Sequence, residues 1–213
     1  MSGILDLLNS DLGKKIIGGV SGQTGESADK TGNLLSMAMP VLMQAMKRNA
    51  STPEGAEGLI GALNGKHDGS ILDNLGSLFN GGVDQDVMDD GDKILGHVLG
   101  GKKENVTNAL SAKSGIEAGS VSEILKVAAP LLMGVLGKQQ KEQQASSQNG
   151  LEGLLGGFLN GNSPQQEQSF LESILDADGD GSVIDDVADM VLGSSKKNEG
   201  GLGSLLGGIF GKK

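Results

Sequence analysis

Apolar residues recur with helical spacing in two long stretches of the chain. The first stretch has seven apolar positions, at Leu34, Leu35, Ala38, Val41, Leu42, Ala45 and Met46. The second has the same spacing, at Ile124, Leu125, Ala128, Leu131, Leu132, Val135 and Leu136. Steps of three and four residues place side chains on one face of an α-helix, whereas a half-buried strand would alternate. The pattern therefore predicts two long amphipathic helices.

A proline lies in the middle of each stretch, Pro40 in the first and Pro130 in the second. Proline removes a backbone hydrogen bond from a helix, so each residue predicts a kink or a restart. Such a kink could serve as a hinge. A packing kink that occurs twice is the simpler interpretation, and we favour it.

Shorter stretches with helical spacing predict further helices, and runs of β-branched residues bounded by turns are nearly absent. We therefore predict an all-α fold. The additional helices are expected at residues 3–17, 55–64, 71–79, 86–100, 104–112, 151–159, 167–175 and 184–192.

The chain contains an internal repeat. Residues 21–46 align with residues 111–136 at an offset of 90, and Pro40-Val41-Leu42-Met43 falls on Pro130-Leu131-Leu132-Met133. Further along, residues 67–74 align with residues 179–186 at an offset of 112, and residues 151–157 are echoed at residues 202–208. Self-similarity of this kind is typical of duplicated folds. We expect two helical copies that pack together.

The repeat and the local composition together predict the organisation of the chain. Residues 138–167 are rich in Gln, Ser and Asn, which is typical of a linker, here with one short helix inside it. We expect a first helical repeat at 1–80, the start of a second at 81–137, this linker at 138–167, the last segment of the second repeat at 168–193 and a flexible glycine-rich tail at 194–213.

The composition restricts both the core and the chemistry. There are 37 Gly, no Cys, Trp or Tyr, and only 4 Phe, so the core must be aliphatic, with glycine-rich connections between helices. The absence of Cys excludes disulfides and thiolate sites. The net charge of −10 argues against a nucleic-acid partner. With no signal-peptide pattern and no uninterrupted apolar run of spanning length, we expect a cytoplasmic protein.

One acidic loop has the pattern of a cation site. Asp176, Asp178 and Asp180 occupy alternate positions, followed by the turn residue Gly181 and by Ser182, whose carbonyl can face inward. This D-x-D-x-D-G pattern is the first part of an EF-hand or dockerin-like calcium loop. We expect Ca²⁺ as the cofactor, with Asp176, Asp178, Asp180, Ser182, Asp185 and Asp186 as its ligands.

The loop departs from the EF-hand pattern at its end. Position twelve is Val187 rather than Glu, so Asp185 or Asp186 would have to complete the coordination shell. In the first copy the leading positions hold Asn64, Lys66 and Asp68, and only the second loop is expected to bind. The alternative is an Asp-rich turn that caps the following helix, although a cap needs a single Asp.

Near its start the chain has Gly3-Ile4-Leu5-Asp6-Leu7-Leu8, followed by the helices centred on Pro40 and Pro130 and by the Asp-rich motif. In these features the sequence resembles the bacterial domain of unknown function 937 family, and more distantly YidB-like proteins. The resemblance covers residues 1 to about 195 and implies a bacterial helical protein. It implies no activity.

No constellation of residues indicates an enzyme. The chain has 2 His, His67 and His97, and lacks the common nucleophile, phosphate-loop and metalloprotease motifs. We expect a non-enzymatic, calcium-stabilised scaffold that binds an unidentified protein or a second copy of itself. The alternative is a peripheral membrane protein that uses the Gly/Leu-rich residues 202–213, although four Gly in twelve residues weaken such a helix.

Overall fold

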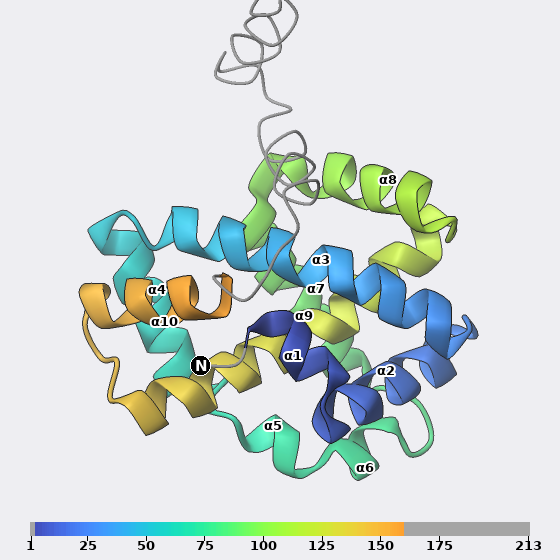
Figure 1. Ribbon diagram of the computed structural model, residues 1–213, viewed down its shortest axis with the longest axis horizontal. Helices are drawn as coiled ribbons and strands as arrows, with labels where there is room; N and C mark the ends of the chain where they lie inside the picture. Colours follow the sequence, from blue (N-terminus) through green and yellow to red (C-terminus); the bar gives the residue numbers. More distant parts are fainter. Residues whose placement is uncertain (1–2, 160–213) are drawn as a thin grey trace, which may run out of the picture. The chain divides into compact units, whose positions relative to one another are not determined.

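A computed structural model describes residues 3–159 of the chain, and all the secondary structure among these residues is helical (Figure 1). The prediction of an all-α fold is confirmed for this part of the chain. In chain order the helices are α1 (Ile4–Asn9), α2 (Asp11–Thr24), α3 (Ala28–Asn49), α4 (Pro53–Asn64), α5 (Ser70–Asp73), α6 (Leu75–Phe79), α7 (Gln85–Leu99), a 3₁₀ turn (Gly100–Lys102), α8 (Lys103–Ser114), α9 (Ala118–Gln143) and α10 (Gln148–Leu159).

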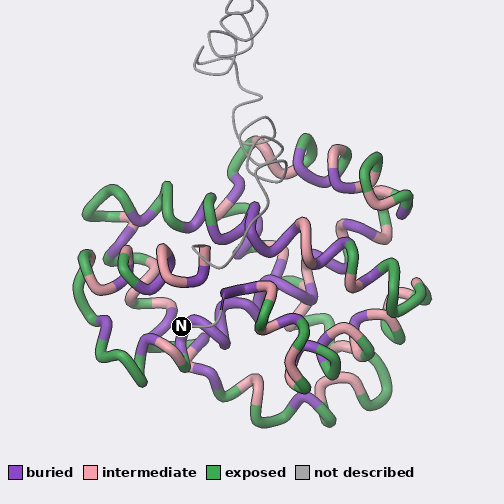
Figure 2. Tube along the Cα trace, in the orientation of Figure 1, coloured by how far each residue is buried: buried purple, intermediate pink, exposed green. Residues whose placement is uncertain are grey.

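The two long helices α3 and α9 form the centre of the core. Each runs through its proline without interruption, and Pro40 and Pro130 are both buried. Figure 2 shows that buried positions follow both helices through the middle of the molecule. Fully burying one Leu or Ile side chain contributes roughly 1.5–3 kcal/mol, so an aliphatic core of this length does not need aromatic residues.

The helix expected at residues 3–17 is in fact two helices, because the backbone turns at Ser10. The Ser10 hydroxyl donates to the Leu7 carbonyl (2.6 Å) and accepts from the Gly13 amide (3.2 Å), so it ends α1 and caps α2. A side chain at Gly13 would collide with the carbonyls of Leu7 and Leu8. The helix expected at 71–79 is likewise divided, into α5 and α6, at Asn74.

The region expected to be a linker is largely helical where it is described. Residues 138–143 complete α9 and residues 148–159 form α10, which leaves 144–147 as the connection. The predicted helices at 167–175 and 184–192 lie outside the described residues.

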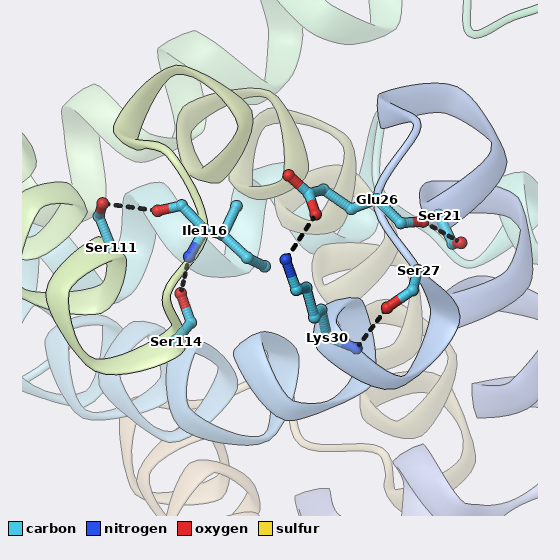
Figure 3. A network of polar contacts seen from close by, with 7 residues as sticks. All are labelled: Ser21, Glu26, Ser27, Lys30, Ser111, Ser114 and Ile116. Carbon is cyan, nitrogen blue, oxygen red and sulfur yellow. Dashed lines mark hydrogen bonds and ion pairs between the residues drawn. The ribbon is translucent and has the colours of Figure 1, made fainter.

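Two helical corners have the same local geometry (Figure 3). In the α2–α3 corner, α2 ends before Gly25 (φ 73°), and the Ser21 hydroxyl donates to the Glu26 carbonyl at 2.6 Å. In the α8–α9 corner, α8 ends before Gly115 (φ 69°), and the Ser111 hydroxyl donates to the Ile116 carbonyl at 2.6 Å. Both glycines adopt the left-handed conformation that ends many helices. Each residue of the α2–α3 corner named here lies 90 residues before its equivalent in the α8–α9 corner.

Packing crosses between the two halves of the described chain. Helix α3 contacts α8 and α10, which follow it at a distance in sequence, while α9 contacts α2 and α4, which precede it. Helices α3 and α9 also contact each other, as do α4 and α10. The half that contains α1–α6 therefore supplies helices that cover α9, and the half that contains α7–α10 supplies helices that cover α3.

Helix α9 has the length and composition of a membrane span, with a mean hydropathy of 1.5 over its most apolar window. In the structure 72% of that window is buried inside the protein. No other helix among residues 3–159 meets the same criterion. The apolar character of α9 is accounted for by its central place in the core.

Candidate functional site

The predicted calcium ligands, Asp176, Asp178, Asp180, Ser182, Asp185 and Asp186, lie outside the described residues. The segment that aligns with them in sequence, at an offset of 112 residues, is described. It is the connection between α4 and α5, residues 65–69, which we call the α4–α5 loop. The geometry of this loop shows the conformation of the aligned segment, in which Asn64 and Lys66 stand in place of Asp176 and Asp178.

Backbone hydrogen bonds and one carboxylate shape the α4–α5 loop. The amides of Gly65 and His67 donate to the carbonyls of Gly61 and Ala62, each at 3.0 Å, and these bonds end α4. One Asp68 carboxylate oxygen accepts from the Ser70 amide at 3.1 Å, just where α5 begins. Gly69 lies between them with a φ of 101°, a conformation that favours glycine. The Asp-Gly-Ser sequence therefore forms a tight turn.

Glycines on α9 allow the loop to approach that helix closely. A side chain at Gly137 would collide with the backbone of His67, and one at Gly134 would come within 2.6 Å of Ile71. Overpacking of this kind costs about 1–3 kcal/mol in a well-packed protein. The position of the loop on α9 is therefore fixed by residues about 70 positions away in the sequence.

Lysine neutralises the acidic side chain of the loop. The Lys141 ammonium donates to Asp68 at 2.8 Å. The hydrogen bonds from Lys141 and from the Ser70 amide hold the pKa of Asp68 well below its ordinary range. Asp68 therefore stays ionised at neutral pH beside a cation that the chain itself supplies.

His67 is the buried titratable group of the loop. It is 8% exposed, and its Nε2 atom lies 3.7 Å from Asp90, which also accepts from Lys66 at 2.7 Å. Burial lowers the pKa of His67, Asp90 opposes this effect and Lys66 adds to it. The net lowering keeps the imidazole neutral at pH 7. His67 is therefore a packed core residue.

A second group of charges joins α7 to α8 and α9. Asp92 accepts from Lys103 at 2.6 Å and pairs with Lys126 at 3.0 Å. These two lysines, Lys103 first, lower the pKa of Asp92. Gly91, next to Asp92, packs against the backbone of Lys126, where a side chain would not fit. The sequence analysis missed this group because its lysines lie on other helices.

Within residues 3–159 the acidic side chains do not form a metal site. No group of three or more His, Asp or Glu in this part of the chain is arranged to hold a metal ion. The carboxylates of Asp68, Asp90 and Asp92 each bind lysine instead. The α4–α5 loop is thus a structural turn whose carboxylate pairs with a lysine of the same chain.

An open cleft of about 680 Å³ lies between α1, α2 and α3. Leu5, Leu8 and Ile17 contribute its apolar surface, and Lys14 and Asp29 lie among its polar lining. The cleft contains no histidine and no cluster of acidic residues. Its lining thus combines apolar side chains with one lysine and one aspartate.

Comparison with known proteins identifies a family and no activity. The model of the family described as "Bacterial protein of unknown function (DUF937)" matches residues 6–139 and again residues 140–213. The match confirms the resemblance noted in the sequence. No curated protein and no solved structure matches the chain significantly.

Proposed function

Because the chain belongs to the DUF937 family of bacterial proteins, whose function is unknown, we propose its function from its own residues. We propose a non-enzymatic helical scaffold that binds protein, including a second copy of itself, and whose C-terminal Asp loop holds Ca²⁺. The proposal has two independent parts, the calcium loop and the protein-binding body.

We infer that the body is an internal duplication. Helices α1 and α7 end 90 residues apart, at Asn9 and Leu99, as do α2 and α8, at Thr24 and Ser114. Helices α3 and α9 begin 90 residues apart, at Ala28 and Ala118, after corners with matching hydrogen bonds. A single offset through three successive helices supports descent of residues 4–49 and 94–139 from one unit.

The pairing of Asp68 with Lys141 carries the calcium proposal. In the first copy the aligned positions are Asn64, the last residue of α4, and Lys66 and Asp68 in the α4–α5 loop. They are neutral in sum, and the one carboxylate binds a lysine ammonium. In the second copy the same positions are Asp176, Asp178 and Asp180. Three neighbouring carboxylates repel one another unless a cation lies among them, and flexible oxygen ligands suit Ca²⁺.

The remaining ligands follow from the same alignment. Ser182 corresponds to Ser70 and would contribute its carbonyl, and Asp185 or Asp186 would complete the shell. A simple turn before a helix needs one carboxylate, as Asp68 illustrates by accepting from the Ser70 amide. The two additional Asp therefore favour ion binding over a simple cap.

Calcium titration followed by thermal unfolding tests this part. At a Ca²⁺ concentration 100 times the dissociation constant, the native state should gain about 2.7 kcal/mol. Asp178→Ala and Asp180→Ala should remove that gain. Asp68→Ala is the matched control, because it alters the loop of the first copy and should leave the calcium-dependent shift unchanged. An unfolding temperature of the unaltered protein that does not respond to Ca²⁺ would refute the calcium site.

The alternative function is peripheral membrane binding through residues 202–213. One observation favours protein contact for this segment. Its pattern repeats that of α10, in which Leu151, Leu154 and Leu155 are buried against other helices. Co-sedimentation with liposomes tests the alternative, by comparing the full chain with a variant carrying Leu205→Asp and Leu206→Asp. Membrane binding requires that the unaltered chain sediment with the vesicles and the variant remain in solution.

A further inference from the structure

The connection between α9 and α10, residues 144–147, has two locally unfavourable features. Gln144 has a φ of 52° and is the one residue other than glycine with a positive φ among residues 3–159. This left-handed conformation is disfavoured for a residue with a side chain. One turn earlier, Gln140 is 1% exposed, and its Oε1 atom has no hydrogen-bond partner although its Nε2 atom donates to Ala145. A buried acceptor without a partner destabilises the folded chain.

The corresponding connection in the first half has neither feature. Helix α3 passes into α4 through Ala50, which has ordinary right-handed backbone angles (φ −71°, ψ −6°). Ala50 lies 90 residues before Gln140 and is also buried, and its methyl side chain has no polar atom that needs a partner. The strain is therefore specific to the connection that leads into α10.

Helix α10 is held mainly by apolar contact with helices from elsewhere in the chain. It packs against α3, α4 and α9, and Leu151, Leu154, Leu155 and Phe158 are buried there. Its polar links to distant residues are two hydrogen bonds of 3.3 Å from Gln148 Nε2, to the carbonyls of Ala50 and Ser51. Apolar burial is non-directional and does not depend on which chain supplies the helix.

We propose that α10 is exchanged between two copies of this chain. In the dimer, residues 144–147 open, and the α10 of each copy occupies the groove between α3, α4 and α9 of the other. The contacts of α10 are retained, Gln144 leaves the left-handed conformation and the Gln140 amide becomes free to bind water. The exchange is reciprocal, so the assembly closes as a two-fold dimer. The proposal rests on the self-association part of the proposed function and is independent of calcium.

Variants of the connection test the proposal in the full chain, with EDTA present so that calcium plays no part. Sedimentation equilibrium should show species of 21.6 kDa and of twice that mass, with the dimer increasing with concentration. Combining Gln140→Ala with Gln144→Gly removes both unfavourable features. It should raise the dimer dissociation constant at least about tenfold, because each dimer contains two connections.

Deleting Ala145 and Ser146 should have the opposite effect, because the shortened connection cannot turn α10 back onto its own chain. We expect this variant to be dimeric at all measured concentrations, with unchanged helix content by circular dichroism. A folded, monomeric deletion variant would overturn the proposal. So would a dimer whose dissociation constant is unaffected by the double substitution.

Cross-linking between chains identifies the exchanged helix. The natural chain has no Cys, so single cysteines report individual positions. Chains with Ser51→Cys and chains with Gln148→Cys are unfolded together in urea, refolded and oxidised. Exchange predicts a mixed disulfide between the two kinds of chain. In the control, Ser77→Cys replaces Ser51→Cys. Ser77 is exposed on α6, and this pair should give no mixed disulfide. Equal yields of mixed disulfide from the two pairs would exclude exchange of α10.

Discussion

The Thr31 side chain offers a direct test of how the core is built. Thr31 lies on α3 with 0% of its surface exposed, and its Oγ1 atom has no hydrogen-bond partner. The residue 90 positions later on α9 is Val121, which is also 0% exposed. Thr and Val have nearly the same shape and similar helix propensity. We therefore expect Thr31→Val to stabilise the protein.

The magnitude follows from desolvation of the hydroxyl. Burying a hydroxyl without a hydrogen bond costs about 1–3 kcal/mol in measurements on proteins. We expect Thr31→Val to gain about 1 kcal/mol, at the lower end, because the local structure relaxes around the hydroxyl. For a chain of this size that gain raises the midpoint of thermal unfolding by about 2–4 °C.

Urea unfolding and calorimetry of the full chain measure this effect. The midpoint should rise at an unchanged slope, which indicates a change in stability rather than in the unfolded state. The reciprocal substitution, Val121→Thr, is the matched control and should lower stability by a similar amount. If Thr31→Val is neutral or destabilising while Val121→Thr destabilises, the Thr31 hydroxyl has a partner and the reasoning fails.

Two further predictions concern the α4–α5 loop. Gly137→Ala should destabilise the protein by about 1–3 kcal/mol, because its methyl group collides with the His67 backbone. Gly153 has open space around it, so Gly153→Ala should raise the free energy of unfolding by up to about 1 kcal/mol. Urea unfolding of the two variants measures both effects. The lowered pKa of His67 predicts stability that is present above its unfolded pKa of 6.5 and is lost as the pH falls toward its folded value. His67→Gln should flatten the pH dependence of the unfolding midpoint as the pH falls below 6.5, and a slope equal to that of the unaltered protein would contradict this.

The periodicity of apolar residues was sufficient to predict the long helices, because a helix that is buried on one face has apolar residues at steps of three and four. It did not predict the break at Ser10. The apolar spacing continues from α1 into α2, with Leu8 and Ile16 both buried, although the backbone changes direction between them. Ser10 is the residue that could have indicated the break, because serine is a preferred N-cap. Its cap of α2 begins a new helix although the apolar pattern continues.

The charged contacts were beyond sequence reasoning for a different reason. Asp68 and Lys141 are 73 residues apart, and only the packing of α5 on α9 brings them together. The sequence drew attention to the acidic residues, whereas the cations that balance them lie on other helices. Asp68 could therefore be predicted as a turn residue, and its lysine partner could not.

The two central helices differ at the positions that decide what covers them. On α9, the buried glycines Gly134 and Gly137 admit the α4–α5 loop and α5. The residues 90 positions earlier on α3 are Gln44 and Lys47, which are exposed. Long polar side chains at these positions exclude a covering segment, so this face of α3 meets solvent. Glycine at these two positions lets α9 be covered on this face as well, and the apolar window of α9 that resembles a membrane span is 72% buried inside the protein.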